Sequence, residues 1–79
     1  MNETEILARL SSVLENVVKK PVSLTLDTDL IGESIIDSLD GMVFMLEVEQ
    51  AFGKSFPEEI NLVTEGYYRM RTLVDYLNQ

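Results

Sequence analysis

Apolar residues recur at helical spacing near both ends of the chain. The stripe near the N-terminus comprises Ile6, Leu7, Leu10, Val13, Leu14, Val17 and Val18. It predicts a helix that begins after Asn2, which forms a capping box with Glu5, and that ends before Pro21. The stripe near the C-terminus comprises Met70, Leu73, Val74 and Leu77. It predicts a helix from about Tyr68 to Leu77.

A third group of apolar residues, in the middle of the chain, predicts a helix with two apolar faces. This helix covers Asp37 to Phe52, with Asp37 as its N-cap. One face of its helical wheel gathers Phe44, Met45, Val48, Ala51 and Phe52. The roughly opposite face gathers Leu39, Met42, Val43 and Leu46. A helix on one side of a small core needs only one apolar face, so the second face is expected to be exposed and to contact a partner. The alternative is a central helix that is buried on both sides.

The connections between these helices give weaker patterns. Residues 22–26 alternate apolar and polar side chains, but the chain offers no second strand to pair with them. Residues 21–36 are therefore expected to form a long ordered loop whose apolar side chains reach the core. Residues 58–66 are expected to hold a short third helix, capped by Asn61 and ended by Gly66.

Size and composition restrict both the fold and the chemistry. A chain of 79 residues supports one domain, residues 1–79, with one modest core. The predicted fold is all-α: a four-helix bundle with a short third helix and a long loop between the first two helices. The sequence has neither cysteine nor histidine, so it offers no disulfide, no thiolate metal site and no imidazole general base. It shows no leader pattern and no apolar run of membrane-spanning length, so a monomeric cytoplasmic protein without membrane insertion is expected.

Acidic residues concentrate in the middle of the chain. The net charge is −8, from fourteen acidic and six basic residues. No Lys or Arg occurs between Pro21 and Gly53, where the acids are Asp27, Asp29, Glu33, Asp37, Asp40, Glu47 and Glu49. This charge disfavours nucleic acid and anionic membranes as partners and favours basic protein surfaces. The alternative is that the acids only keep a small protein soluble.

The segment DTDLIGESIIDS partly matches a calcium-binding EF-hand loop. Asp27, Asp29 and Gly32 fall at three of the required positions. Ile31 and Ser38, however, stand where an oxygen ligand and a bidentate glutamate are needed, and the segment before Asp27 does not read as an entering helix. The sequence therefore predicts no specific calcium site and no metal ligands.

Ser38 stands between Asp37 and Asp40 at the start of the predicted central helix. A capping aspartate and an acid in the first turn explain the sequence DSLD by themselves. A catalytic serine would need an adjacent base, but the chain has no histidine and its lysines are distant from Ser38 in sequence. The residues therefore favour a serine that another enzyme modifies over a catalytic nucleophile.

The segment DLIGESIIDSLDGMVFMLEVEQAFGKSFPEE resembles the central part of acyl carrier proteins, and LVDYL resembles their last helix. The resemblance follows the order of the whole chain. It implies that a phosphopantetheinyl transferase attaches 4′-phosphopantetheine from coenzyme A to Ser38. The attached arm would carry acyl or aminoacyl groups as thioesters to partner enzymes. The transferase would supply the catalytic machinery, including Mg²⁺, so the chain is expected to be a carrier and not an enzyme.

The resemblance also implies a docking surface on the central helix. The residues expected to form this surface are Asp37, Leu39, Asp40, Met42, Val43, Leu46, Glu47 and Glu49. The expected partners are the transferase, a ligase that loads the acyl or aminoacyl group, and acyl-transferring enzymes with basic docking patches.

Several positions depart from the pattern of the family. Val43 stands where many members have an acid, Gly41 lies inside the helix, and Arg69 stands where a capping Ser or Thr is common. IIDSL resembles specialist carriers, such as those that carry D-alanine to cell-wall polymers, more than the main carrier of fatty acid biosynthesis. The cargo stays open between fatty acyl, polyketide-type acyl and aminoacyl groups, with specialised acyl, lipid or secondary metabolism favoured. The alternative from a different functional class is a small acidic adaptor protein that never receives phosphopantetheine.

Overall fold

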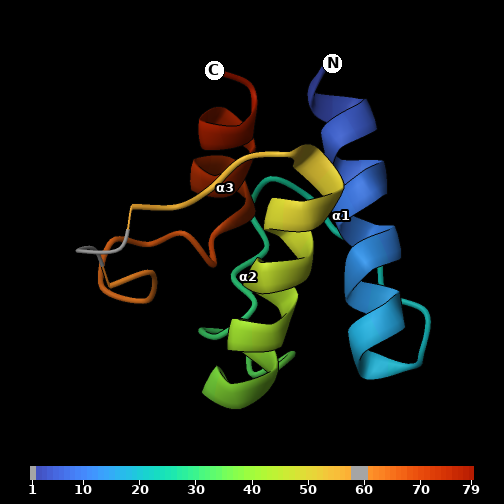
Figure 1. Cartoon of the computed structure of the whole chain (residues 1–79). Helices are drawn as coiled ribbons and strands as arrows, with labels where there is room; N and C mark the ends of the chain where they lie inside the picture. Colours follow the sequence, from blue (N-terminus) through green and yellow to red (C-terminus); the bar gives the residue numbers. More distant parts are fainter. Residues whose placement is uncertain (1, 58–60) are drawn as a thin grey trace.

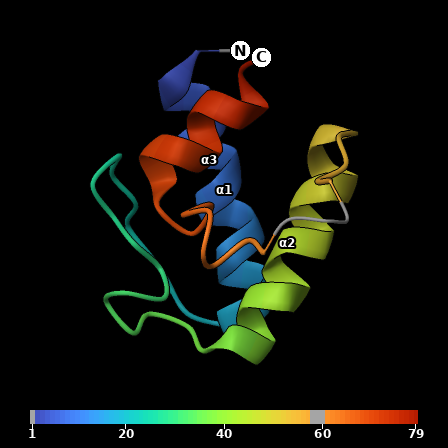
Figure 2. The same ribbon diagram turned by 90° about the vertical axis from the view of Figure 1, so that its left-hand side faces the viewer.

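Three helices make up the regular structure. The computed structural model describes residues 2–57 and 61–79, which form α1 (Glu3–Val18), α2 (Ser38–Phe52) and α3 (Met70–Leu77) (Figure 1). α1 packs against both α2 and α3. The start of α1 and the end of α3 lie at the same end of the molecule (Figures 1 and 2). Within these two ranges there is no strand, and no helix is long and apolar enough to cross a membrane. The all-α class is therefore confirmed.

The two long helices begin where the sequence predicts, because a side chain caps each of them. Asn2 Oδ1 accepts a 2.9 Å hydrogen bond from the Glu5 amide at the start of α1. Asp37 Oδ1 accepts a 2.8 Å hydrogen bond from the Asp40 amide at the start of α2. These bonds satisfy amides that have no partner inside a helix. α2 ends at Gly53, whose φ of 62° places it in the left-handed region that favours glycine.

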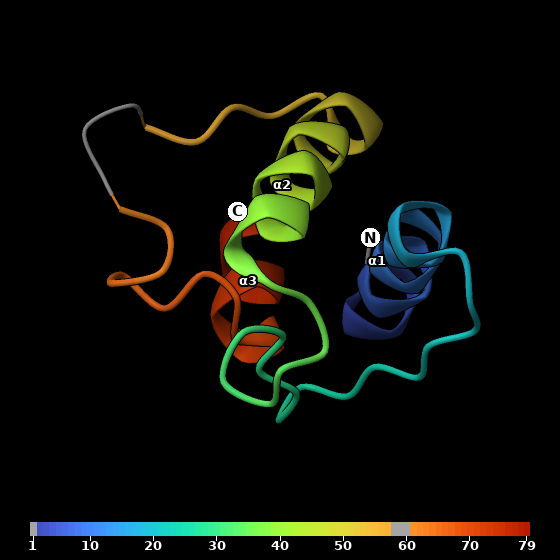
Figure 3. The ribbon, with the colours of Figure 1, turned by 90° about the horizontal axis from the view of Figure 1, so that it is seen from below.

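The long loop between α1 and α2 is ordered because its backbone pairs with the start of α3. The Met70 amide donates to the Thr28 carbonyl at 2.8 Å, and the Leu30 amide donates to the Tyr68 carbonyl at 3.0 Å. Carbonyls of the loop thus replace a capping side chain at α3, since Arg69 makes no side-chain cap. This pairing also explains why α3 begins at Met70, two residues later than expected. Figures 2 and 3 show the loop running past α3 towards the start of α2.

The expected third helix is not confirmed. Residues 58–60, where it would begin, lie outside the described residues, and residues 62–68 form turns. Asn61 Oδ1 accepts from the amides two and three residues further along the chain, both at 3.0 Å. Gly66 has a φ of 78°. Asn61 and Gly66 therefore shape a run of turns, and the described fold has three helices instead of four.

One core gathers the inner sides of the helices and of the long loop. Its buried apolar residues are Ile6, Leu10, Leu14, Leu30, Ile36, Phe44, Met45, Val48, Tyr68, Met70, Leu73 and Val74. Leu30 and Ile36 belong to the loop, so the expectation that the loop's apolar side chains reach the core is confirmed. Ala51 is a correction, because it is exposed although the helical wheel placed it with the core residues. It lies in a shallow groove opposite the small side chains of Ala8 and Ser12 in α1, which leave its methyl group uncovered.

Gly41 is buried in α2 because the ring of Tyr68 packs against its backbone. A Cβ atom at this position would lie 2.8 Å from the Tyr68 hydroxyl oxygen and 2.9 Å from its Cε1 atom. Tyr68 is only 4% exposed, so its ring has little freedom to move aside. The same burial raises the pKa of the Tyr68 hydroxyl, because the charged phenolate loses hydration. The glycine inside the helix, which the sequence alone left unexplained, is thus required by a close approach.

The variant Gly41→Ala tests this contact. Alanine favours the helix by about 1 kcal/mol, but overpacking against the buried ring costs about 1–3 kcal/mol. We expect a net loss of about 1 kcal/mol in the free energy of unfolding, measured in urea. In a Tyr68→Leu background the same substitution should be neutral or stabilising, since the ring is gone. A Gly41→Ala protein that is more stable than the parent would contradict the proposed contact.

Candidate functional site

Ser38 is the first residue of α2, and its side chain is exposed. The preceding residue, Asp37, directs its carboxylate to the Asp40 amide and thereby fixes the start of the helix. Amide groups of the first turn and the helix dipole make this end of α2 favourable for an anion. The structure therefore places the Ser38 hydroxyl at the surface, where a negatively charged group attached to it is tolerated.

A continuous apolar face lies exposed on α2 next to Ser38. Leu39, Met42, Val43 and Leu46 are 69%, 64%, 44% and 59% exposed. The opposite face of the helix supplies core residues, as described above. The expectation of a second, exposed apolar face is therefore confirmed within the described residues, and the alternative of a central helix buried on both sides is wrong.

The acidic side chains of α2 have different surroundings. Asp37 and Asp40 are exposed at the start of the helix, and Glu47 is half-buried. Glu49 is also half-buried, and its Oε2 atom accepts a 2.7 Å hydrogen bond from the Phe56 amide. Glu49 therefore fastens the segment that follows α2 to the helix, a role that the sequence gave no means to foresee. Its additional role in docking stays a prediction.

A small apolar groove borders the exposed face. Met42, Met45 and Leu46 of α2 form one side, and Phe56 and Leu62 form the other. Its volume is about 220 Å³. The groove extends the apolar face of α2 sideways, and its second wall comes from the connection to α3. Figure 3 shows this connection leaving the end of α2 and returning to the start of α3. Sequence reasoning missed it because the two walls belong to different segments.

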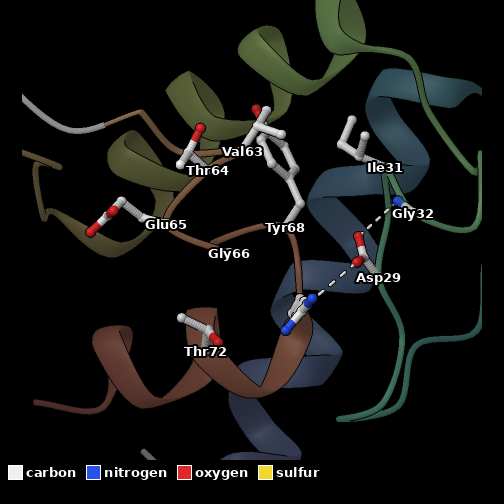
Figure 4. A pocket seen from close by; sticks show the side chains of 10 residues that line it. Asp29, Ile31, Gly32, Val63, Thr64, Glu65, Gly66, Tyr68 and Thr72 are labelled. Atoms are coloured by element: carbon white, nitrogen blue, oxygen red, sulfur yellow. Dashed lines mark hydrogen bonds and ion pairs between the residues drawn. The ribbon is translucent and has the colours of Figure 1, made fainter.

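A second hollow, a cavity of about 320 Å³, is more polar in its lining (Figure 4). It lies between the long loop, the turns and the start of α3, and is lined by Asp29, Ile31, Gly32, Val63, Thr64, Glu65, Gly66, Tyr68, Arg69 and Thr72. Asp29 Oδ1 accepts from the Gly32 amide at 2.8 Å, and Asp29 Oδ2 lies 3.5 Å from Arg69 Nε. Only the pairing of the loop with α3 brings these distant segments together, so no sequence motif indicated the cavity.

The two aspartates that match an EF-hand loop have other partners. Asp27 Oδ1 accepts a 2.9 Å hydrogen bond from Arg71 Nη2, and Asp29 pairs with Arg69. Among residues 2–57 and 61–79, no group of three or more acidic, histidine or cysteine side chains is arranged to hold a metal ion. These aspartates instead tie the long loop to the start of α3.

Comparison with known proteins decides the family. A family model described as "Phosphopantetheine attachment site" matches residues 4–64, which include Ser38 and all of α2. The chain belongs to the phosphopantetheine-binding family of carrier proteins. An acyl carrier protein of Coprothermobacter proteolyticus (strain ATCC 35245 / DSM 5265 / OCM 4 / BT) is 33% identical over 60 residues, which cover 75% of this chain and 73% of that protein. No solved structure gives a significant match.

Membership of this family confirms several expectations. Carrier proteins of this kind are shuttles without enzymatic activity, and 4′-phosphopantetheine is their prosthetic group. The chain is accordingly a carrier protein on which other enzymes, a phosphopantetheinyl transferase and acyl-handling enzymes among them, act. The surroundings of Ser38 suit the group, because an exposed hydroxyl at a helix start accommodates a phosphodiester.

The exposed face of the carrier protein can be tested by introducing a charge. Val43→Glu should change the free energy of unfolding by less than about 0.5 kcal/mol, because the side chain already reaches water. Val48→Glu, at a fully buried valine of the same helix, is the matched control and should unfold the protein. Thermal and urea unfolding monitored by circular dichroism provide the measurement. Unfolding by Val43→Glu would show that this face belongs to the core.

Proposed function

We propose that Ser38 of this carrier protein holds the 4′-phosphopantetheine arm and that the protein presents acyl intermediates to partner enzymes in specialised acyl, lipid or secondary metabolism. The observation that supports this proposal most strongly is the position of Ser38. Of the six serines in the chain, it is the one that begins a helix among the described residues, and it adjoins the exposed apolar face of α2.

The residues around Ser38 explain why another enzyme must perform the attachment. The Ser38 Oγ atom forms a bond to phosphorus of coenzyme A, the bond to the adenosine bisphosphate leaving group breaks, and the hydroxyl proton passes to a base of the transferase. This chain supplies no histidine for that proton, and Asp37 already uses one carboxylate oxygen to cap the helix. Once attached, the arm supplies the thiol that holds cargo as a thioester, which a chain without cysteine otherwise lacks.

We further propose that α2 forms the docking surface for the transferase, a loading ligase and acyl-transferring enzymes. Its apolar part is Leu39, Met42, Val43 and Leu46, and its acidic part is Asp37, Asp40, Glu47 and Glu49. An exposed apolar face flanked by acids complements a partner whose apolar patch is flanked by basic side chains. A second copy of the chain fits poorly, because its net charge of −8 repels another copy.

An aminoacyl carrier is the second candidate for the cargo. The segment IIDSL, residues 35–39, favours it, because this segment resembles specialist carriers such as those that carry D-alanine to cell-wall polymers.

The attachment site is tested by intact mass. Incubation with coenzyme A and a promiscuous phosphopantetheinyl transferase should add the mass of one phosphopantetheine group to the protein. Ser38→Ala should gain nothing, whereas Ser12→Ala, at an exposed serine of α1, should be modified like the parent. A parent protein that gains no mass with an active transferase would instead support the acidic adaptor, and modification of Ser38→Ala would place the group elsewhere.

Acidic docking is tested by the rate of the same reaction. Asp40→Lys should lower kcat/KM for modification about tenfold at low ionic strength, because an attractive contact becomes repulsive. The difference should shrink as salt is added. Glu3→Lys changes an acid in the first turn of α1 and controls for helix-dipole and net-charge effects. Equal rates for both variants, with helicity retained, would argue against acidic docking on α2.

A further inference from the structure

The hydroxyl of Tyr68 is a hydrogen-bonding group without a protein partner. The Tyr76 hydroxyl donates to the Ser55 carbonyl at 2.6 Å, whereas the Tyr68 hydroxyl makes no hydrogen bond within residues 2–57 and 61–79. In the same ranges, no fully buried side-chain oxygen lacks a partner. Tyr68 as a whole is only 4% exposed. The small exposed part of this side chain therefore includes its hydroxyl oxygen, which is open to a ligand at the surface.

This hydroxyl lies beside the first turn of α2. A Cβ atom at Gly41 would be 2.8 Å from its oxygen, and Figure 4 shows the ring of Tyr68 reaching towards α2. The Cα–Cβ bond in a helix tilts towards the N-terminus, so this direction at Gly41 leads over the turn that contains Ser38. Cβ atoms three positions apart on a helix are about 5–6 Å apart. A group attached to the Ser38 hydroxyl is therefore within reach of the Tyr68 hydroxyl.

A phosphodiester on Ser38 needs hydrogen-bond donors at this place. Asp37 and Asp40 stand next to it in the first turn, and residues 21–53 hold no Lys or Arg. The Asp40 amide already donates to the Asp37 carboxylate, and the Gly41 amide donates to the Asp37 carbonyl. Only the amides of the first two residues of α2 remain as donors in this turn.

The Tyr68 hydroxyl has the right chemistry for a further donor. Burial raises its pKa, so it stays protonated at neutral pH and offers an O–H group. A phosphodiester oxygen is a charged acceptor, and hydrogen bonds to charged groups are stronger than those between neutral groups.

We infer that the Tyr68 hydroxyl donates a hydrogen bond to the phosphodiester on Ser38 and thereby holds the root of the arm against α2. The inference rests on the proposed attachment of the arm to Ser38. Tyr68 is then a positioning residue that sets the direction in which the arm leaves the helix. Gly41 has a part in this arrangement, because only glycine lets the ring come so close. The contact forms only after modification, so the hydroxyl stabilises the modified protein more than the unmodified one.

Tyr68→Phe tests the inference, because it removes only the hydroxyl oxygen. Urea unfolding is measured for the unmodified and the phosphopantetheinylated forms of parent and variant. The substitution should raise the equilibrium constant of unfolding about fivefold more in the modified form than in the unmodified form. Tyr76→Phe is the matched control, since it loses the hydrogen bond to Ser55 in both forms and should weaken both by the same factor.

Nuclear magnetic resonance gives a second readout at the contact itself. The phosphorus resonance of the modified protein should shift in Tyr68→Phe and keep its position in Tyr76→Phe. In the parent, the ring carbon that bears the Tyr68 hydroxyl should shift on modification, and this measurement needs no variant.

Two outcomes separate this inference from the proposed attachment. Intact mass that shows no modification, or modification at a residue other than Ser38, rejects the attachment and this inference with it. Complete modification at Ser38, with equal effects of Tyr68→Phe on both forms and no shift of the phosphorus or ring-carbon resonances, would overturn this inference alone.

Discussion

Backbone hydrogen bonds between the long loop and the start of α3 hold the functional parts of this carrier protein together. The Met70 amide donates to Thr28, the Arg71 amide donates to Leu26 at 3.0 Å, and Leu30 donates back to Tyr68. These bonds replace the missing cap of α3 and order a loop that has no strand or helix of its own. They also fix Tyr68 at the position where its ring meets Gly41. The contact between Tyr68 and α2, the cavity between the long loop and the start of α3, and the burial of Leu30 all depend on this pairing.

α2 packs one face into the core and leaves the opposite face exposed. α2 buries Phe44 and Val48 and leaves Leu39 and Met42 in water. Exposure of so many large apolar side chains is unfavourable for a monomer, and it is understandable when partner enzymes bind there for short periods. Asp37 has two roles, because it caps α2 and contributes charge to the proposed docking surface.

Much of this arrangement follows from the sequence because it depends on neighbours along the chain. The caps formed by Asn2 and Asp37, the stop at Gly53 and the two faces of α2 are local features, and the structure has them where the residues indicate. The family could also be inferred, because its motif is contiguous around Ser38. These elements need only helical periodicity and short-range hydrogen bonding.

Most of the features that the sequence did not reveal depend on residues that are distant along the chain. The need for glycine at position 41 follows only from its contact with the ring of Tyr68. α3 begins two residues later than expected because residues 68 and 69 pair with the loop. Glu49 accepts a hydrogen bond from the Phe56 amide beyond the end of α2. A local effect explains the turns that follow Asn61 in place of the expected helix. The Asn61 side-chain oxygen accepts hydrogen bonds from two backbone amides, and these bonds compete with helical ones.

A phosphopantetheine arm on Ser38 is what would make this chain a carrier. Mass spectrometry of the protein purified from the cells that produce it, with fragmentation of the peptide that contains Ser38, tests this attachment. We expect a phosphopantetheine group on Ser38, free or with its cargo attached as a thioester. A protein that is unmodified throughout growth, or that carries the group on another serine such as Ser34, would contradict it.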